Sequence, residues 1–394
     1  MREATRISAL RPSAIRAAGK LIASKPGCIT FAGGYPSADI MPVDEMKIIT
    51  DDLLEKQSRT VLQYGMTKGN DGLMDQIVKL MEGKGIHCTK DNIQITTGSQ
   101  QAISLTGMLA LNKGDVVVME NPTYLGAISA YVPYEAELIG VDADEHGMIM
   151  AELEKVLEQN KNVKLIYVVP NFSNPTGKTW SLERRRQLLD IAKKYDVLIA
   201  EDDPYGDIRF DGESVPSIKS LDDDGHVIYM GSFSKILFAG LRVGYTVSSK
   251  EIADYFEIFK QGIDLQSNEF AQFQIAEYLK RYDLKKQIQR IVDTYRVKRD
   301  LMCRLIDEKF PKCVKRTNPQ GGMFVWIELP EGIDATELLK KSVEEIGVGF
   351  VPGGPFFADG SKVNTIRLNF STVDQKQIED GMLKFADLLH RELS

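Results

Sequence analysis

Short apolar runs alternate with helical segments through the middle of this 394-residue chain, and no other feature limits its fold as strongly. The runs that have the length and character of buried strands cover residues 93–96, 115–119, 163–169, 197–200, 227–230 and 244–248. Helices are predicted between them over 99–111, 124–132 and 181–196, the last with Ser181 as N-cap and residues 183–186 on its solvent face. This alternation predicts a mostly parallel sheet covered by helices on both faces.

The two ends of the chain have a different pattern. Long helices are predicted from about residue 268 to 304, and helices over 335–345 and 374–393 accompany short strands at 322–327, 348–351 and 365–370. This is the pattern of an α+β unit. At the other end, helices are predicted over 13–21, over 43–58 and within 67–85.

Composition and charge exclude several classes of function. Hydrophobic residues make up 43% of the chain and charged residues 27%, as in a soluble globular protein. A net charge of −7 argues against binding to nucleic acids or anionic membranes. No apolar run approaches the roughly 18 residues of a membrane span. The first residues lack the apolar stretch of a secretory signal, so a cytoplasmic location is expected.

The four cysteines and four histidines do not indicate a metal site. The cysteines form no CxxC pair, and no histidine lies at metal-ligand spacing from them. We expect the cysteines to be reduced and structural, the histidines to have no catalytic role, and the protein to bind no metal.

A lysine with two hydroxyls beside it follows the predicted strand at 227–230. Ser232, Ser234 and Lys235 come directly after this strand, and Arg242 lies seven positions beyond the lysine. A lysine can form an imine with an aldehyde, and hydroxyls with an arginine can hold a phosphate. Pyridoxal 5′-phosphate (PLP) carries both groups. For this segment alone, a solvated lysine at a strand end is an equally good interpretation.

Three carboxylates follow the apolar residues 197–199. In α/β enzymes ligands bind outside the carboxyl edge of the sheet, and PLP needs one carboxylate facing its pyridine nitrogen. Because successive strand residues point to opposite faces, we expect Asp202 to meet the ring and Glu201 and Asp203 to lie in a solvated loop. Tyr205 lies one short turn further on, within reach of the 3′-oxygen of the ring.

Two turns supply further candidate groups. Asn174 follows the apolar run 165–169 and can donate to the 3′-oxygen, although Asn-Pro and a later Gly are also ordinary turn chemistry. The junction at Gly98-Ser99-Gln100 offers the backbone N–H groups and the positive end of a helix to the phosphate. Such turns are also common without a ligand.

Taken together, these segments resemble the PLP-dependent aminotransferases of fold type I, in the order of that family and over nearly the whole chain. The phrases at 31–36, 98–101 and 201–205 are most similar to the bacterial 2-aminoadipate and kynurenine aminotransferase group. The resemblance implies an α/β fold with a mostly parallel, seven-stranded sheet and a smaller α+β domain. Residues 1–44 would be an N-terminal arm of the small domain, 45–285 the large PLP-binding domain and 286–394 the rest of the small domain.

The resemblance also assigns roles within the cofactor site. Lys235 would form the Schiff base and act as general base, with Asp202 at the pyridine nitrogen and Tyr205 and Asn174 at the 3′-oxygen. The ring of Tyr124 would stack on the pyridine, although a core or turn tyrosine is the alternative without the family context. The phosphate would be bound by Ser99, Gln100, Ser232, Ser234 and Arg242.

The same family pattern implies the substrate contacts and a dimer. Arg367 would bind the α-carboxylate, with a structural salt bridge as the alternative, and the loop at Gly34 would cover the substrate. Arg16 could pair with a distal carboxylate, and an ordinary exposed helix arginine is an equal alternative. Tyr64 would reach the phosphate of the neighbouring subunit, which implies a homodimer with shared active sites.

The implied reaction moves an amino group from an L-amino acid to a 2-oxo acid, with 2-oxoglutarate as the expected acceptor. The donor stays open between aminoadipate, an aromatic amino acid, kynurenine and a branched aliphatic amino acid. A C–S/β-lyase or decarboxylase of the same fold type is an alternative, because the motifs report the cofactor more than the fate of the carbanion. A PLP-sensing regulatory domain is a further alternative, against which the acidic charge and the early start of the first helix argue.

Overall fold

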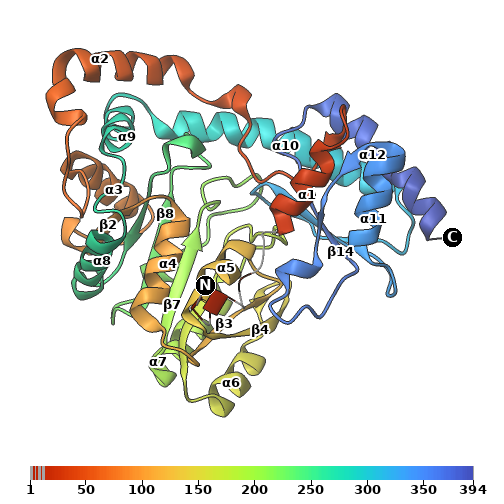
Figure 1. Cartoon of the computed structure of the whole chain (residues 1–394), viewed down its shortest axis with the longest axis horizontal. Helices are drawn as coiled ribbons and strands as arrows, with labels where there is room; N and C mark the ends of the chain where they lie inside the picture. The colour runs from red at the N-terminus through yellow and green to blue at the C-terminus, as the bar shows by residue number, and fades with distance from the viewer. Residues whose placement is uncertain (1–2, 5, 8–9, 11–13, 394) are drawn as a thin grey trace.

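The computed structural model describes residues 3–4, 6–7, 10 and 14–393, so Ser13 of the first predicted helix lies outside the described residues. Its centre is an eight-stranded sheet with the order β2-β9-β8-β7-β6-β3-β4-β5 (Figure 1). The strands are β2 (Ile93–Thr96), β3 (Val116–Asn121), β4 (Glu137–Asp144), β5 (Gly147–Met148), β6 (Val163–Val168), β7 (Leu198–Asp203), β8 (Val227–Ser232) and β9 (Gly244–Val247).

Most neighbouring strands of this sheet run parallel, as predicted. The parallel part runs through β4, β3, β6, β7 and β8, whereas β9 is antiparallel to both of its neighbours. The short β5 forms an antiparallel hairpin with β4 and makes an eighth strand where seven were expected. Neither β4 nor β5 was predicted, because β4 is only half buried and its apolar residues are interrupted by Gly140.

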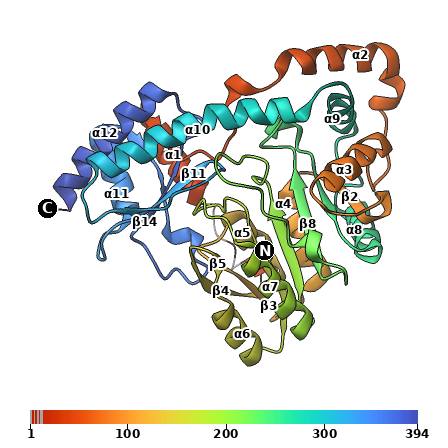
Figure 2. The same cartoon turned by 180° about the vertical axis from the view of Figure 1, so that it is seen from behind.

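Each face of the sheet buries its own apolar layer. On one face Met119, Leu165 and Ala200 belong to the larger core, and α4 (Ser99–Ala110) packs over them beside α5 (Leu125–Tyr131). On the other face Val118 and Ile199 belong to a second core under α6 (Met150–Gln159) and α7 (Leu182–Tyr195). Figures 1 and 2 show α4 and α7 on opposite sides of the sheet. The alternation of side chains along each strand therefore builds both layers.

The start of α7 confirms one sequence prediction and corrects another. Ser181 is its N-cap, and its hydroxyl accepts a hydrogen bond from the backbone N–H of Arg184. Arg185 was expected on the solvent face but is fully buried. Its guanidinium donates to the carbonyl of Pro170 at 3.0 Å and to Oδ1 of Asn171 at 2.7 Å. These acceptors replace water, which removes much of the cost of burying the charge.

A group of helices covers the β2 end of the sheet. It contains α2 (Val43–Val61), α3 (Asp71–Gly83), α8 (Lys250–Ile263) and α9 (Glu269–Arg281). Helices α2 and α3 pack on α9, and α8 packs on α4 and β2. The long helix α10 (Leu284–Lys309) runs from this group to the C-terminal part of the chain, where α12 (Gln375–Glu392) packs against it (Figure 1).

The C-terminal part is an α+β unit, as predicted. Its antiparallel sheet has the order β10-β11-β14-β13, with β10 (Lys315–Arg316), β11 (Phe324–Glu328), β13 (Val351–Pro352) and β14 (Thr365–Asn369). Helix α11 (Ala335–Lys341) continues as the π-helical turn Ser342–Ile346.

Helix α1 (Ala14–Ala23) and strand β1 (Ile29–Thr30), which lie early in the chain, pack on this C-terminal unit (Figure 1). Strand β1 pairs in parallel with β12 (Val348–Gly349), and α1 contacts β12 and β13. The expected division into a small domain of residues 1–44 with 286–394 and a large domain of 45–285 stays a prediction.

The described residues form neither a membrane-spanning helix nor a cluster of metal ligands. No helix among them has the length and apolar character that a bilayer span requires. The same residues contain no group of three or more His, Cys, Asp or Glu side chains placed to hold a metal ion. All four cysteines carry free thiols.

Candidate active site

A cavity of about 1070 Å³ lies where β6, β7 and β8 end, between the large sheet and the N- and C-terminal segments. Nearly all of the site residues that the sequence predicted line this cavity. The predicted residues in its wall are Gly34, Ser99, Gln100, Tyr124, Asn174, Asp202, Tyr205, Ser232, Ser234, Lys235, Arg242 and Arg367.

The three carboxylates of β7 have separate surroundings. Asp202 lies in the cavity wall, its Oδ2 accepts a hydrogen bond from the Tyr167 phenol at 2.8 Å, and its Oδ1 is buried without a partner among the described residues. Glu201 accepts backbone N–H groups of residues 218 and 219, both at 2.8 Å. Asp203 accepts the Tyr229 phenol at 2.8 Å.

The strand continues through these three residues, so the expected solvated loop at Glu201 and Asp203 is wrong. Both side chains are buried because each has donors within the fold. The predicted alternation holds, since Asp202 alone of the three lines the cavity.

The charges of Asp202 and Lys235 are set mainly by burial. Burial raises the pKa of Asp202 to about 7, against the lowering effect of the Tyr167 hydrogen bond. Burial, and after it the nearby cations Arg367 and Arg242, lower the pKa of Lys235 to about 8. The Lys235 amine donates to the carbonyl of Gly34 at 2.7 Å. A buried amine among cations loses its proton readily, as a nucleophile or base requires.

A strand-to-helix turn forms an anion cradle on one side of the cavity. Gly98 caps α4 with φ +74°, and a Cβ there would overlap the Arg242 guanidinium. This guanidinium donates to Oγ of Ser234 at 3.3 Å, and the backbone N–H of Ser234 donates to Oγ of Ser232 at 3.1 Å. The first turn of a helix also leaves N–H groups unpaired by the helix. Together with Ser99 these groups suit a phosphate.

Arg367 occupies the opposite side of the cavity, on β14. Its Nη1 donates to Oδ1 of Asn174 at 3.0 Å and its Nη2 to the carbonyl of Ala32 at 2.8 Å. Burial lowers its pKa to about 10. Its Nε has no partner, and no carboxylate pairs with it, within the described part of the chain. The alternative of a structural salt bridge is therefore not observed.

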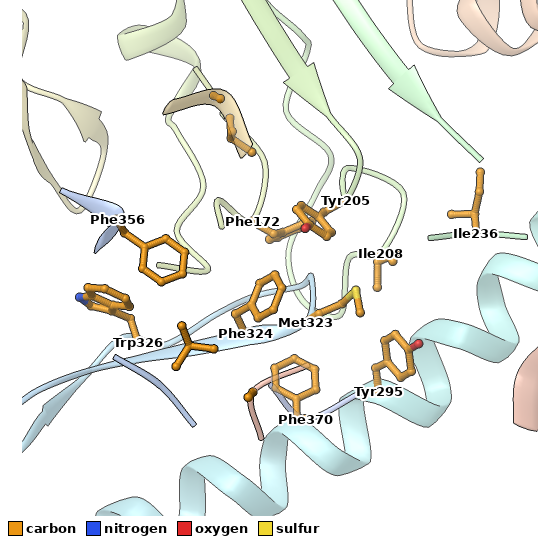
Figure 3. Packing of buried hydrophobic residues seen from close by; sticks show 14 of the residues in the cluster. Phe172, Tyr205, Ile208, Ile236, Tyr295, Met323, Phe324, Trp326, Phe356 and Phe370 are labelled. Atoms are coloured by element: carbon orange, nitrogen blue, oxygen red, sulfur yellow. The ribbon is translucent and has the colours of Figure 1, made fainter. Parts of the chain in front are cut away.

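Aromatic rings hold this guanidinium on two sides. Its central carbon lies 4.4 Å from the ring centre of Phe324 and 5.3 Å from that of Phe356. Figure 3 shows these two rings in one buried cluster, with Trp326 beside Phe356 and Tyr205 beside Phe324. The cation–π contacts fix the guanidinium in the absence of a carboxylate partner.

Two predicted residues of the cofactor ring site also interact. Burial raises the pKa of Tyr205 and the neighbouring Asn174 side chain lowers it, so the two side chains lie close together in the cavity wall. The Tyr124 phenol donates to Oε1 of Gln100 at 3.4 Å, and Nε2 of Gln100 donates to the carbonyl of Gly126 at 2.8 Å. The ring of Tyr124 is thereby tied to the first turn of α4.

The structure does not bring Arg16 and Tyr64 into this cavity. Arg16 is exposed on α1, and Tyr64 is 78% exposed in the loop after α2. Their predicted roles therefore stay predictions that depend on substrate and on a second subunit.

Several residues at the site were not predicted from the sequence. Tyr167, Phe324 and Phe356 contact predicted site residues, and Ile15 and Ile22 of α1 line the cavity. For Tyr167 there was a usable signal, since it is the one hydroxyl in the apolar run 165–169, and a buried phenol needs a partner.

Known proteins that are similar to this chain over nearly its whole length are aminotransferases. An aromatic-amino-acid aminotransferase of Thermococcus litoralis is 41% identical over 98% of this chain and 93% of its own length. A 2-aminoadipate transaminase of Thermus thermophilus is 36% identical over 96% of this chain and 94% of its own. The crystal structure of a Pyrococcus horikoshii kynurenine aminotransferase, in complex with PMP, has a TM-score of 0.95 at 40% identity, covering 100% of this chain and 98% of that one.

A family model described as aminotransferase class I and II matches residues 33–384. The match confirms the predicted fold type, the predicted enzyme class and PLP as the cofactor. The residues fit this cofactor, since the wall offers an unpaired buried carboxylate oxygen on Asp202 and a glycine cradle beside Arg242. The chain therefore belongs to the class I and II aminotransferase family.

Proposed function

We propose that this enzyme transfers the amino group of an L-amino acid with a large apolar side chain to 2-oxoglutarate. One observation carries the proposal: Lys235, the unpaired oxygen of Asp202 and Arg367 meet in one cavity. An amine, an acid for a ring nitrogen and a carboxylate-binding guanidinium are the groups that amino-acid chemistry on PLP requires.

PLP, when bound, supplies an aldehyde and an electron-withdrawing ring. We assign to Asp202 Oδ1 the task of accepting the N–H of that ring, and to the cradle of Ser99, Ser234 and Arg242 the phosphate. Arg367 binds the α-carboxylate of the substrate through two parallel N–H groups. Lys235 then removes the Cα proton, for which its lowered pKa suits it near neutral pH.

The N-terminal segment supports the choice of donor. The cavity wall formed by α1 and the residues after it includes the apolar Ile15, Ile22, Pro26 and Cys28, with Lys25 and Thr30 beside them. A large apolar side chain gains free energy from burial there. Relatives named as aromatic-amino-acid and kynurenine aminotransferases support the same choice. Under this proposal Arg16 would contact only a donor that carries a distal carboxylate.

We also propose that the enzyme is a cytoplasmic homodimer. Leu62, Tyr64 and Met66 are 66%, 78% and 70% exposed, and Leu265 is 48% exposed. The backbone N–H of residue 65 donates to the side chain of residue 266 at 2.5 Å, so the two segments that carry these exposed apolar residues lie side by side. Such a patch is typical of a protein interface, and Tyr64 would extend from it toward the partner. The free thiols favour a reducing compartment.

A panel of amino acids with 2-oxoglutarate tests the function. We expect glutamate to form fastest with aromatic or large aliphatic donors, and Lys235→Ala to form none while it keeps its fold. Pyruvate and ammonia in place of glutamate would indicate a lyase. No glutamate from any donor with PLP-saturated protein would refute the proposal.

A further inference from the structure

We infer that Tyr167 is a positioning residue for the reaction: its phenol holds Asp202 as an ionised carboxylate with one oxygen turned into the cavity. The inference rests on the proposed function, because it concerns the carboxylate that is assigned to the ring nitrogen of PLP.

Sheet geometry brings the two side chains together. Tyr167 on β6 is paired with Ala200 on β7, and Ala200 and Asp202 lie two positions apart on the same strand face. The phenol therefore reaches diagonally across the parallel pair to Oδ2 of Asp202 at 2.8 Å. Tyr167 and Asp202 are 0% and 2% exposed, so water does not compete for this bond.

The phenol is the donor in this bond whenever Asp202 is ionised, because a carboxylate has no proton to donate. Burial, and then the charge of Asp202, raise the pKa of Tyr167 well above its usual value, so the hydroxyl keeps its proton. The neighbouring ring of Tyr131 packs edge-on at a centroid distance of 6.1 Å and limits the movement of Tyr167. With Oδ2 engaged, Oδ1 is the carboxylate oxygen left for a ligand.

The other groups that face Asp202 do not replace this donor. Burial and the charge of Asp203 on β7 both favour the protonated acid, whereas Tyr167 and the Lys235 cation favour the carboxylate. The remaining groups that interact with its charge are the phenols Tyr124, Tyr131 and Tyr205, none of which donates a hydrogen bond to it. Once Lys235 loses its positive charge, Tyr167 is the one remaining group of this set that stabilises the carboxylate.

Removal of the phenol oxygen should therefore make Asp202 a weaker acid. A protonated Asp202 cannot accept the ring N–H. As the pH is lowered, the variant should therefore lose turnover and PLP binding at a higher pH than the wild type does. For Tyr167→Phe we expect kcat at pH 7 to fall about tenfold with little change in the KM of the donor, as for loss of one hydrogen bond to a charged group. The acidic limb of the kcat profile should move to higher pH.

Tyr131→Phe is the matched control, because this buried phenol bonds Thr106 at 3.0 Å rather than Asp202. PLP affinity, measured by equilibrium dialysis from pH 6 to pH 8, gives a readout that does not depend on turnover. We expect Tyr167→Phe to lose several-fold more affinity than Tyr131→Phe at pH 6, and the two to converge toward pH 8.

If Tyr167→Phe does not fold, 3-fluorotyrosine at position 167 keeps the shape of the side chain and strengthens the donor. The acidic limb should then move to lower pH. Profiles and PLP affinities that match those of Tyr131→Phe or the wild type would overturn the inference. That result leaves the proposed function intact. The proposed function itself would be refuted if the wild-type enzyme showed no transaminase activity.

Discussion

Arg367 keeps its charge in the protein interior with no counterion among the residues that the structure describes. One amide oxygen, one backbone carbonyl and two aromatic rings surround its guanidinium. None of these groups carries a net charge, so they stabilise the cation without neutralising it, and an incoming carboxylate gains a strong Coulomb interaction. Arg185 is buried in a similar way, by carbonyl and amide oxygens.

This geometry predicts the result of Arg367→Lys. An ammonium group cannot make two parallel bonds to a carboxylate, so the KM of the amino donor should rise by about 10-fold or more, with a smaller fall in kcat. Steady-state kinetics with a saturating 2-oxo acid measure both. Arg209→Lys is the control, since Arg209 also stacks on an aromatic ring, at 4.7 Å from Phe172, outside the cavity. Equal effects of the two substitutions would contradict the assignment.

Glu120 illustrates a buried acid away from the chemistry. It lies at the end of β3, accepts the indole N–H of Trp180 at 2.9 Å, and burial raises its pKa to about 8 from 4.5. Because the folded-state pKa is raised, the native protein binds more protons than the unfolded chain between about pH 4.5 and pH 8. The stability contribution of this group is therefore present below pH 4.5 and is lost as the pH rises to 8.

We predict that Glu120→Gln raises the melting temperature at pH 8.5 by about 2–4 °C and leaves it nearly unchanged at pH 5. The amide keeps an acceptor for Trp180 and cannot ionise. Differential scanning calorimetry at the two pH values checks this, with exposed Glu137→Gln on β4 as the control. An equal gain at both pH values would show that ionisation of Glu120 is not the cause.

At the scale of elements, the site depends on how strands end. Strands β7 and β8 extend to Asp203 and Ser232, past the ends that the apolar pattern predicted, because the polar residues there find hydrogen-bond partners in the fold. Helix α4 begins after a short turn from β2, and the Arg242 guanidinium packs against Gly98 in that turn. Behind it, the buried Lys260 of α8 binds Asp264 at 2.6 Å and Gln101 at 2.9 Å.

The turn before α4 predicts a specific effect of Gly98→Ala. Alanine is disfavoured at φ +74°, and its Cβ would displace the Arg242 guanidinium from the cradle. The dissociation constant of PLP, measured by dialysis, should rise about tenfold as a charge-assisted contact to the phosphate is lost. Gly262→Ala in α8 is the control, because a Cβ there meets nothing within 4 Å. Unchanged PLP affinity in Gly98→Ala would show that this turn does not bind the phosphate.

At the scale of the whole molecule, the cavity wall joins the two ends of the chain to its middle. The N-terminal segment supplies Ile15 and Gly34, the large sheet supplies Lys235 and Asp202, and β14 supplies Arg367. Figure 1 shows that α1, although it is the first helix of the chain, lies among the C-terminal elements. Movement of this combined unit would change the substrate end of the cavity and leave the phosphate cradle in place.

The proposed dimer gives a prediction at this scale. Leu265→Asp places a charge in the exposed surface formed with Tyr64 and Met66, and it should convert the dimer to monomer and lower activity at least tenfold. Light scattering at several concentrations measures the mass. Leu383→Asp in α12, at the other end of the molecule, is the control (Figure 1). A dimer that survives Leu265→Asp would place the interface on another surface.

Local patterns in the chain predicted most of the strands and helices, although not β4, β5, α6 or α8, and they supplied the polar residues at the strand ends and the resemblance to the family. Strand alternation was sufficient to select Asp202 over its two neighbours, because side-chain direction follows from a period of two. Tertiary structure alone decided which groups meet: Tyr167 with Asp202, and Arg367 with Asn174 and the rings of Phe324 and Phe356. Burial and charge at the site depend on these partners from distant segments, and the local pattern contains no information about them.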